Sequence, residues 1–332
     1  MRNLTLLSLS LLVANAAHAD LGAIPTQSGW SGFLLGGVSA ISHESNFYAG
    51  GDSNGHIDGL GSPASESELA PLINADIRYT FADTRTQVFL GNLIQDALRF
   101  DFTQQLGIRQ EMGDKGIVAG SVVFNAMPVE LWSDPFAVGV DRSATDAKSK
   151  GVRFAWDKIW GSNFNGSLTT REMELDEEHS GQQYDQRHGT QYASMLDRNG
   201  KIHDMELSYQ WHFGGGQLLE PAILYKQADL DGSAESFKNL GMQLTYAKRG
   251  PQWSVVGNAY AGKREYDEAN PLFGQRADAR EFVLAGTFFW HNLMGVRDLS
   301  ATVTAAYNQA DSDIAFYDTQ TSILSAGLLY NF

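Results

Sequence analysis

The sequence contains no cysteine among its 332 residues. Disulfide bonds and thiolate chemistry are therefore excluded, and an exported fold must be stabilised in another way. The sequence also lacks an apolar stretch near the roughly 20 residues that a membrane-spanning helix requires, and its mean hydropathy is −0.26. This composition excludes a helical membrane protein. It does not exclude a β-barrel, because only every second residue of a barrel strand faces lipid.

Positive charge is scarce as well. Lys and Arg total 24 against 39 for Asp and Glu, which gives a formal net charge of −15 at pH 7. An acidic chain with scattered basic residues is not typical of proteins that bind nucleic acid. We therefore expect no nucleic acid among the partners of this protein.

The first 19 residues have the pattern of a cleavable secretory signal. Arg2 supplies the positive start, an apolar run follows over residues 4–14, and Ala17-His18-Ala19 is an A-x-A cleavage site. The apolar run is too short to cross a bilayer as a helix, and no cysteine stands beside the site to carry a lipid. We expect removal of residues 1–19 and a single mature domain over residues 20–332.

The last stretch of the chain, residues 319–332, has the pattern of a strand with one apolar face. Period-two spacing places Leu324, Ala326, Leu328, Tyr330 and Phe332 on that face. The opposite face is mostly polar or small, with Ile323 and Leu329 as exceptions. The alternative for such a strand is the last strand of a soluble β-sandwich.

The same alternation recurs along the whole mature chain, which predicts an all-β fold of about fourteen strands, with 12–16 as the range. The predicted strands cover residues 30–41, 72–81, 85–93, 98–108, 117–127, 152–160, 164–174, 205–213, 218–227, 240–248, 253–262, 282–290, 299–308 and 319–332. Short turns follow the even strands and longer polar loops follow most odd ones. A single closed antiparallel transmembrane β-barrel with short periplasmic turns and long extracellular loops has this pattern.

Aromatic residues, 11% of the chain, gather near predicted strand ends, as the interfacial girdle of a membrane barrel requires. The residues concerned are Trp156, Trp160, Trp211, Tyr246, Trp253, Trp290, Tyr307 and Tyr330.

The signal, the alternating strands and the terminal Tyr330-Asn331-Phe332 together resemble a Gram-negative outer-membrane β-barrel of porin-like size. The first strand, from Ser31-Gly32-Phe33 to Glu44-Ser45-Asn46, is similar to a family of uncharacterised proteobacterial outer-membrane proteins. The resemblance implies an outer-membrane location, with lipid, lipopolysaccharide and the barrel-assembly machinery as partners. It implies that the last strand is the assembly signal, through the residues Gly327, Leu328, Tyr330 and Phe332. It brings no catalytic residue and no cofactor.

If the apolar phase of each strand faces lipid, charged residues of the other phase line the lumen. We expect the pore-lining residues to include Arg78, Arg85, Arg99, Asp101, Arg153, Asp157, Arg171, Glu206 and Glu281, and less clearly Glu220. Basic residues come mainly from the first half of the chain and acidic ones from the second, which predicts two oppositely charged walls and a transverse field. The alternative is that the arginines pair with acidic neighbours such as Asp76, Asp101 and Asp157.

Topology predicts the height of these charges in the barrel. We expect one charged constriction in the external part, with Arg78 and Arg85 near the periplasmic mouth. The expected constriction consists of Arg99, Arg153, Arg171, Glu206 and Glu281.

No residue set indicates catalysis or a metal site. His203, His212 and Ser208 share one strand at a spacing that does not converge on a substrate atom. His179 and His188 lie in a polar loop. The acidic segments 52–58 and 229–232 place oxygen ligands at alternate positions, but neither has EF-hand spacing.

Two functions of different classes follow from the sequence. The first is a channel for passive or selective diffusion of small hydrophilic solutes. The second is a non-conducting barrel that acts through its extracellular loops in adhesion, receptor duty or envelope structure. The sequence leaves open whether barrels associate as homo-oligomers.

Overall fold

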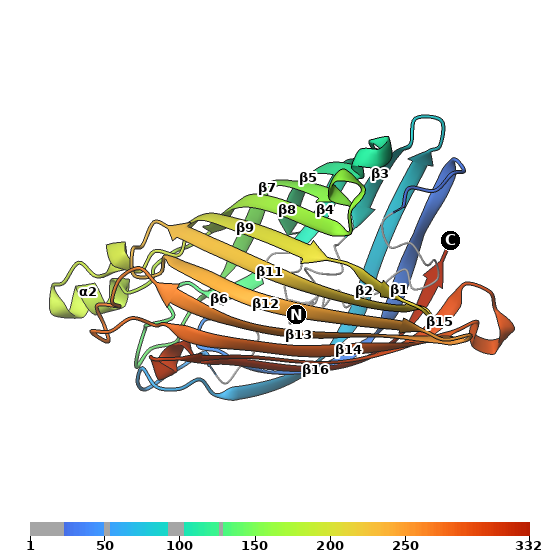
Figure 1. Cartoon of the computed structure of the whole chain (residues 1–332). Helices are drawn as coiled ribbons and strands as arrows, with labels where there is room; N and C mark the ends of the chain where they lie inside the picture. The colour runs from blue at the N-terminus through green and yellow to red at the C-terminus, as the bar shows by residue number, and fades with distance from the viewer. Residues whose placement is uncertain (1–22, 50–53, 92–102, 126–128) are drawn as a thin grey trace.

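The computed structural model describes residues 23–49, 54–91, 103–125 and 129–332, and these form a closed antiparallel β-barrel (Figure 1). Its strands are β1 (Gly29–Glu44), β2 (Ser65–Phe81), β3 (Thr86–Gly91), β4 (Thr103–Glu111), β5 (Ile117–Asn125), β6 (Val129–Trp132), β7 (Ala144–Asp157), β8 (Phe164–Leu175), β9 (Gly200–Tyr209), β10 (Trp211–Phe213), β11 (Gln217–Leu230), β12 (Phe237–Arg249), β13 (Trp253–Tyr266), β14 (Ala279–His291), β15 (Leu299–Ser312) and β16 (Thr319–Asn331). β5 and β6 both pair with β7, and β9 and β10 both pair with β11. The wall therefore has fourteen strand positions, as predicted.

The barrel closes where its first and last strands meet. β1 pairs with β16 over its length and with β2 on its other side. The backbone of Phe332 exchanges two hydrogen bonds with Gly32, at 3.0 and 3.1 Å. Closure pairs the edge groups of both strands, which an open sheet in hydrocarbon would leave unsatisfied.

Side chains alternate between the outside and the lumen along each strand, as predicted. On β12, Leu240, Met242 and Leu244 are exposed on the outside, while Asn239 and Gln243 point inward and are buried. An apolar outer face, an even number of wall strands and full closure are the properties of bacterial outer-membrane barrels. The protein is therefore an outer-membrane β-barrel.

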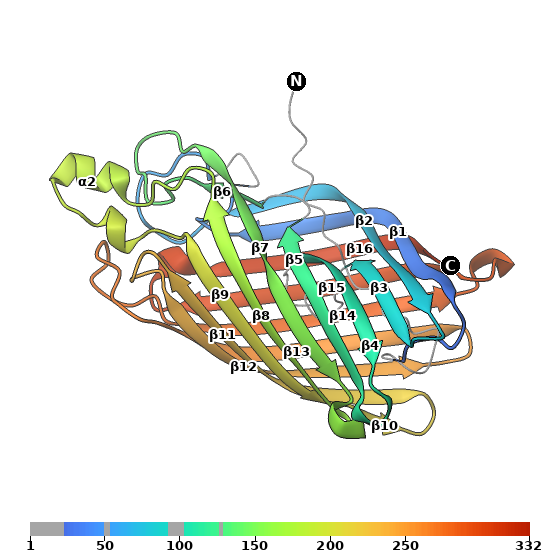
Figure 2. The ribbon, with the colours of Figure 1, turned by 90° about the horizontal axis from the view of Figure 1, so that it is seen from above.

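The two ends of the barrel differ in their connections. The end that carries the C-terminus has the shorter turns, at residues 82–85, 112–116, 158–163, 214–216, 250–252 and 292–298. The other end has most of the longer connections, whose described residues are 45–49 with 54–64, 133–143, 176–199, 231–236, 267–278 and 313–318. The short-turn end is thus periplasmic and the other external. Helix α2 (Gln182–His188) lies at the external end, away from the C-terminus (Figures 1 and 2).

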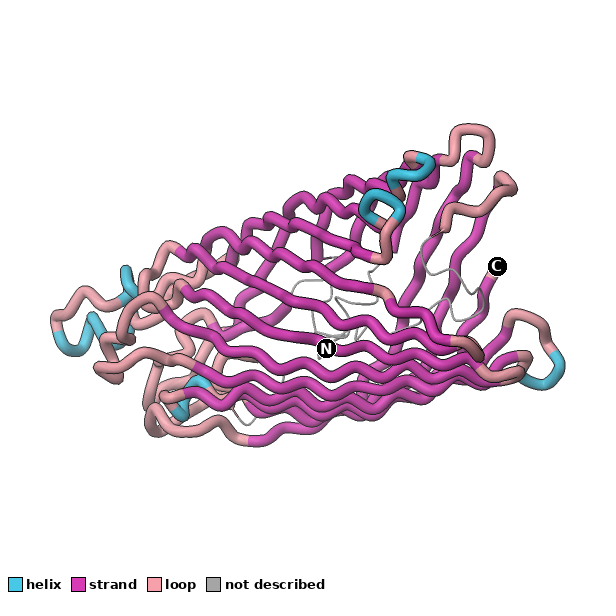
Figure 3. Tube along the Cα trace, viewed as in Figure 1, coloured by secondary structure: helices cyan, strands magenta, loops and turns pink. Residues whose placement is uncertain are grey.

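Helices occupy little of the described chain and lie in the connections at the two ends of the barrel (Figure 3). Within that described part, none of them is long and apolar enough to cross a membrane.

A girdle of outward-facing aromatic rings surrounds the periplasmic end. Neighbouring rings contact one another, with centroids 5.0 Å apart for Trp30 and Tyr79 and 5.2 Å apart for Trp156 and Trp160. Most residues predicted for a girdle lie here. Tyr307 does not, because it lies in the external half of β15, where its hydroxyl is 2.8 Å from Gln309 Oε1 and 2.9 Å from Gln320 Oε1.

The strands extend further at the external end than predicted. β2 begins at Ser65 rather than residue 72, β9 begins at Gly200 rather than 205, and β13 ends at Tyr266 rather than 262. These extensions are rich in polar residues, so they resemble loops in the sequence. The predicted fourth strand begins at residue 98, and its residues 98–102 lie outside the described chain.

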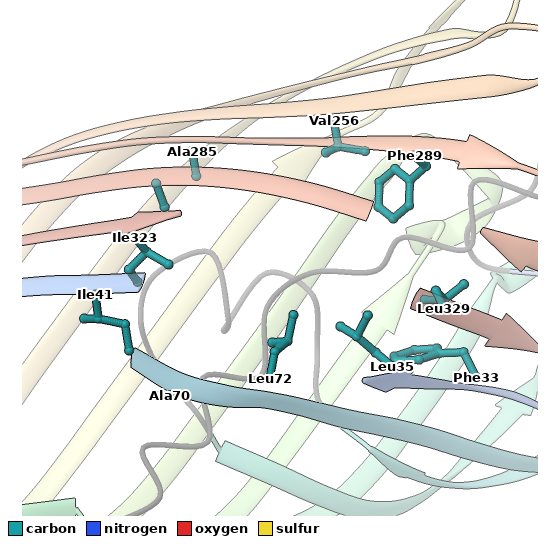
Figure 4. Close-up of a cluster of buried hydrophobic side chains, with 11 residues drawn as sticks. Phe33, Leu35, Ile41, Ala70, Leu72, Val256, Ala285, Phe289, Ile323 and Leu329 are labelled. Carbon is teal, nitrogen blue, oxygen red and sulfur yellow. The ribbon is translucent and has the colours of Figure 1, made fainter. Parts of the chain in front are cut away.

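The lumen face is not uniformly polar. Apolar side chains on the inner side of β1, β2 and β13–β16 form one buried cluster, which Figure 4 shows: Phe33, Leu35, Ile41, Ala70, Leu72, Val256, Ala285, Phe289, Ala306, Ile323 and Leu329. Ile323 and Leu329 are the two residues that broke the polar phase of the last strand in the sequence. We call these residues the apolar cluster.

Candidate lumenal site

A row of polar side chains crosses the lumen face of six neighbouring strands. Each member is the direct cross-strand partner of the next, from β7 to β13. The members are Arg153, Thr169, Asp204, Lys226, Asn239 and Arg264. Because barrel strands are tilted, the row rises from the middle of β7 to the external ends of β12 and β13. We call it the charged row.

Contacts along the charged row join opposite charges. The ammonium of Lys226 lies 3.3 Å from Asp204 Oδ1. At the upper end, Arg264 forms an ion pair with Glu281 of β14. At the lower end, Arg153 Nε donates to Thr169 Oγ1 at 2.6 Å.

Uncharged groups connect the upper end of the row. Tyr260 donates its hydroxyl hydrogen to Asn239 Oδ1 at 2.8 Å, and the amide nitrogen of Asn239 donates to Glu281. Glu281 is thus held by a guanidinium and by an amide, which fixes its carboxylate on the lumen face. Charge-assisted bonds of this kind are stronger than neutral ones.

A cavity of about 180 Å³ lies against the charged row. Its lining includes every member of the row together with Glu206, Tyr260 and Glu281. Cations and anions thus face the same open space. Such a wall can hydrate and orient polar solutes that carry either sign of charge.

The structure brings together three of the predicted pore-lining residues, since Arg153, Glu206 and Glu281 line this one cavity. Arg171 stands beside it, with Nε 3.8 Å from Asp204 Oδ2. Glu220 faces the lumen lower down and accepts a hydrogen bond of 2.6 Å from Ser208.

The remaining predicted pore residues lie elsewhere. Arg78 pairs with Asp76 on the same strand at 2.6 Å, and Asp157 pairs with Arg109 at 3.1 Å. Arg85 belongs to the periplasmic turn 82–85. Arg99 and Asp101 lie outside the described residues.

Arg85 lies at the periplasmic mouth, where it connects neighbouring segments instead of lining the pore. Its guanidinium donates to the carbonyl oxygens of Ile24 and Pro25 at 2.6 and 2.7 Å and pairs with Glu111. It thereby ties the segment before β1 to the turn and to β4.

The predicted division into a basic and an acidic wall is wrong for the described residues. Arg78, Arg171 and Arg264 each have a carboxylate within 4 Å, so opposite charges alternate around the lumen. The alternative of local pairing describes these contacts, and Asp76 is one of the partners it named. Arg109, rather than a predicted residue, pairs with Asp157.

Sequence reasoning missed several ionic residues of the described lumen, among them Arg109, Asp204, Lys226 and Arg264. Asp204 and Arg264 lie just outside the predicted strands, in the polar extensions described above. Lys226 lies inside a predicted strand. Its phase, opposite to that of the outward-facing Ile223 and Tyr225, could have shown that it points into the lumen.

The external connections pack into a small aromatic core of their own, which we call the cap. Its buried apolar residues are Phe136, Leu196, Ala234, Tyr266, Ala277, Ile314, Phe316 and Tyr317. They come from five of the long connections and the end of β13. Phe136 and Phe316 stack with centroids 5.3 Å apart. The polar loops predicted from sequence therefore hold a packed structure at the external end.

Buried polar groups tie the cap together. The Tyr317 hydroxyl donates to Glu235 and accepts from the Asn270 amide at 2.6 Å. Burial raises the pKa of Glu235 to about 8, against the opposing effects of the Tyr317 hydrogen bond and of Arg198. Arg198 itself pairs with Glu178 at 2.9 Å. Glu235 is thus held largely as a neutral acid at pH 7.

No group of three or more His, Asp or Glu side chains in the described chain is already arranged to hold a metal ion. Ser208 donates to Glu220, and His203 contacts Thr170 instead of Ser208. His179 contacts Ser133 at 2.8 Å, but Ser133 is buried. These contacts fasten strands and loops to one another.

Comparison with known proteins gives a family without an assigned activity. A family model described as a protein of unknown function (DUF2860) matches residues 29–331. No curated protein matches the sequence.

Solved outer-membrane proteins are similar at low identity. An OmpT loop-deletion mutant of Vibrio cholerae is 7% identical, covers 92% of this chain and 99% of its own, and has a TM-score of 0.41. A Pseudomonas aeruginosa FadL homologue is 9% identical, covers 97% and 95%, and has a TM-score of 0.45. The channel DcaP of Acinetobacter baumannii is 10% identical, covers 92% and 97%, and has a TM-score of 0.44. At this similarity the evidence for the fold is the strand pairing of the chain itself.

Proposed function

We propose a function for this chain, which belongs to the DUF2860 family of proteins of unknown function. It is an outer-membrane channel for small hydrophilic solutes. The family supplies no activity, so the proposal rests on the geometry of the lumen. The observation that carries it is the charged row beside an open cavity.

The charged row supports a channel because burying its charges has a desolvation cost that a gain in folding stability does not explain. Ion pairs that are only partly buried contribute little to folding, since the desolvation of both charges offsets their attraction. Lys226 and Asp204 keep 36% and 26% of their side-chain surface exposed. A water-filled pore with low-dielectric walls focuses the field of such charges on passing solutes.

We assign solute contact to the lining of the cavity. Arg153, Glu206 and Glu281 act there together with Lys226 and Asp204, and Arg171 acts through Asp204. Arg78, which pairs with Asp76, and Asp157, which pairs with Arg109, lie toward the periplasmic end and contribute less to solute contact. Arg99 and Asp101 stay predictions from the sequence. No catalytic step and no cofactor is part of this function.

The cap favours the second candidate function, a barrel that acts through its loops. The buried aromatic core, with neutral Glu235 inside it, stabilises the external loops. Loops held in this way form a defined surface that is suited to contact with another molecule. In that case the lumen would not conduct. The two candidates differ in one measurable property, which is ion current.

Planar-bilayer recordings on purified mature protein test the proposal. We expect stable open levels and, in a salt gradient, opposite shifts of the reversal potential for two variants of one ion pair. Lys226→Gln removes the cation and shifts selectivity toward cations, and Asp204→Asn shifts it toward anions.

Lys238→Gln is the matched control, because Lys238 follows the outward phase of β12 and makes the same charge change outside the lumen. It should leave the reversal potential at the wild-type value. An absence of stable open levels in the wild-type protein would instead favour the loop-mediated function.

A further inference from the structure

A second group of ionisable side chains lies on the lumen face, away from the charged row. His43 near the external end of β1 stands directly opposite Glu66 of β2, and Glu68 is the next inward-facing residue on β2. His43 and Glu66 are 6% and 8% exposed. The His43 imidazole and the Glu66 carboxylate are thus largely shielded from water, and the partly buried Glu68 lies next along β2.

Three polar atoms of this group are buried without a hydrogen-bond partner in the part of the chain that the structure describes. They are His43 Nε2, Glu66 Oε2 and Glu68 Oε1. His43 Nε2 and Glu66 Oε2 are 3.8 Å apart, which is too long for a hydrogen bond. Buried polar atoms almost always have a partner, and an unpaired buried carboxylate is costly.

Neighbouring groups among the described residues do not supply the missing partner. The other oxygen of Glu66 accepts the backbone N–H of Asn54 at 2.9 Å. The guanidinium of Arg142 donates to the carbonyl oxygens of Asn46, Asn54 and Pro135. Arg142 therefore compensates the charge of Glu66 only from a distance, and Glu66 Oε2 stays directed at His43.

We propose that His43, Glu66 and Glu68 bind a divalent transition-metal ion of the Zn²⁺ type. Two ligands that each lie about 2.1 Å from one ion can be 3.8 Å apart, as His43 Nε2 and Glu66 Oε2 are. An imidazole nitrogen suits Zn²⁺, Ni²⁺ or Cu²⁺ better than Ca²⁺ or Mg²⁺. In the structure the three groups do not converge on one point, so the proposed site requires the Glu68 side chain to rotate toward His43 and Glu66.

This site is independent of the proposed channel. It joins β1 to β2 next to the barrel closure, and the bound cation would neutralise two acidic residues that otherwise repel one another.

Isothermal titration of tag-free mature protein with Zn²⁺, and separately with Ca²⁺, tests the proposal. We expect one Zn²⁺ per chain and no saturable Ca²⁺ binding at the same concentrations. His43→Ala and Glu66→Gln should each weaken Zn²⁺ binding by about tenfold or more. Heat-modifiable migration on gels shows whether each variant still forms the barrel.

His203→Ala is the matched control. His203 Nε2 also lies 3.8 Å from a carboxylate oxygen, that of Asp229, but this pair is exposed on the outside of the wall. It should leave the Zn²⁺ affinity unchanged. Absence of Zn²⁺ binding to the wild-type protein, or equal affinity in the folded His43→Ala variant, would overturn the proposal.

Discussion

The closing seam and the charged row are two parts of one barrel wall, and their lumen faces differ in polarity. At the seam, where β16, β1 and β2 meet, the lumen face carries Phe33, Leu35 and Leu72 from the apolar cluster. On β7 to β13 the same inward phase carries the charged row beside a cavity. The outer face of the seam is apolar, and so is that of the row except toward its external end, where Lys238 and Lys263 follow the outward phase.

This difference in polarity separates the residues that stabilise barrel closure from those that can act on solutes in the lumen. Apolar side chains pack without directional requirements and contribute stability in proportion to the area they bury. Ion pairs on a wet wall contribute little to stability but create a field. We therefore expect changes at the seam to affect folding, and changes in the row to affect solutes.

Gly37→Val should have the largest effect. Gly37 stands opposite Gly327 across the seam, and a Cβ at Gly37 would lie 2.2 Å from the carbonyl oxygen of Ala326. Because that atom belongs to the backbone, the two strands must separate, at a cost of about 3 kcal/mol or more. We expect loss of the heat-modifiable barrel band.

Gly36→Ala provides the control for Gly37→Val, because a Cβ at Gly36 meets nothing within 4 Å. It should fold like the wild type. Equal loss of the barrel band in both variants would show that the close approach of Gly37 to the Ala326 backbone is not the cause of the loss.

Leu324→Arg should have the next largest effect. Leu324 is 60% exposed on the outer face near the middle of β16. An arginine on the lipid face near the bilayer midplane costs about 2–4 kcal/mol, measurable by urea unfolding in lipid vesicles. Thr319→Arg, which points into the cavity, should cost less than about 1 kcal/mol.

Ser325 is not a suitable inward control for this comparison, although the sequence places it on the polar phase. The structure buries it to 2% exposure and joins its hydroxyl to that of Ser39 at 2.8 Å. An arginine there would have to displace the apolar cluster around it.

Period-two patterning was sufficient to predict the class of fold and the number of wall strands. It failed where both faces of a strand are alike. At the seam Ile323 and Leu329 are apolar on the inward phase, so they look like exceptions to the alternation. At the external end the opposite occurs, and the polar start of β2 at Ser65 looks like a loop.

The site was less predictable than the fold, because a single sequence does not give cross-strand register. Alternation correctly directs Arg153 and Glu206 inward, but only register shows that Lys226 stands opposite Asp204. The cap was not predictable either. Its core joins Phe136 and Phe316, which are far apart in the sequence and lie in segments of polar composition.

Loss of Phe332 tests the seam at its terminal residue. Deletion removes the two backbone hydrogen bonds to Gly32, worth roughly 2 kcal/mol together, and the last aromatic ring of the proposed assembly signal. Phe332→Ser removes only the ring. We expect both variants to lower outer-membrane levels in cells, while only the deletion lowers stability after refolding in detergent. Normal cellular levels of Phe332→Ser would contradict the assembly role of the ring.

A rise in pH should destabilise the cap without affecting the pairing of strands at the seam. Burial raises the pKa of Glu235 from 4.5 to about 8, so the folded state retains a proton that the unfolded state releases. The resulting stability is complete below pH 4.5 and is lost as the pH rises through about 8. Tyr317, Tyr266, Arg198, Glu178 and Arg264 are the ionisable groups that act on Glu235.

Hydrogen exchange of residues 231–236 and 313–318 should therefore accelerate between pH 5 and pH 9, after correction for the intrinsic rate. Glu235→Gln should remove this pH dependence, because an amide keeps the size of the acid without its titration. A pH dependence that survives in Glu235→Gln would assign it to another group of the cap.

Asp204→Asn should have the smallest effect on stability and completes the comparison with the seam. The side chain keeps its size, and its partner Lys226 is 36% exposed, so water can solvate the ammonium after the ion pair is lost. We expect a cost below about 1 kcal/mol, measured by the same urea unfolding as for Leu324→Arg. The same variant should shift the reversal potential, since it removes one negative charge from the cavity wall. A cost as large as that of Leu324→Arg, with an unchanged reversal potential, would mean that the charged row stabilises the wall in the way that the apolar cluster does, and the non-conducting function would then explain the lumen better.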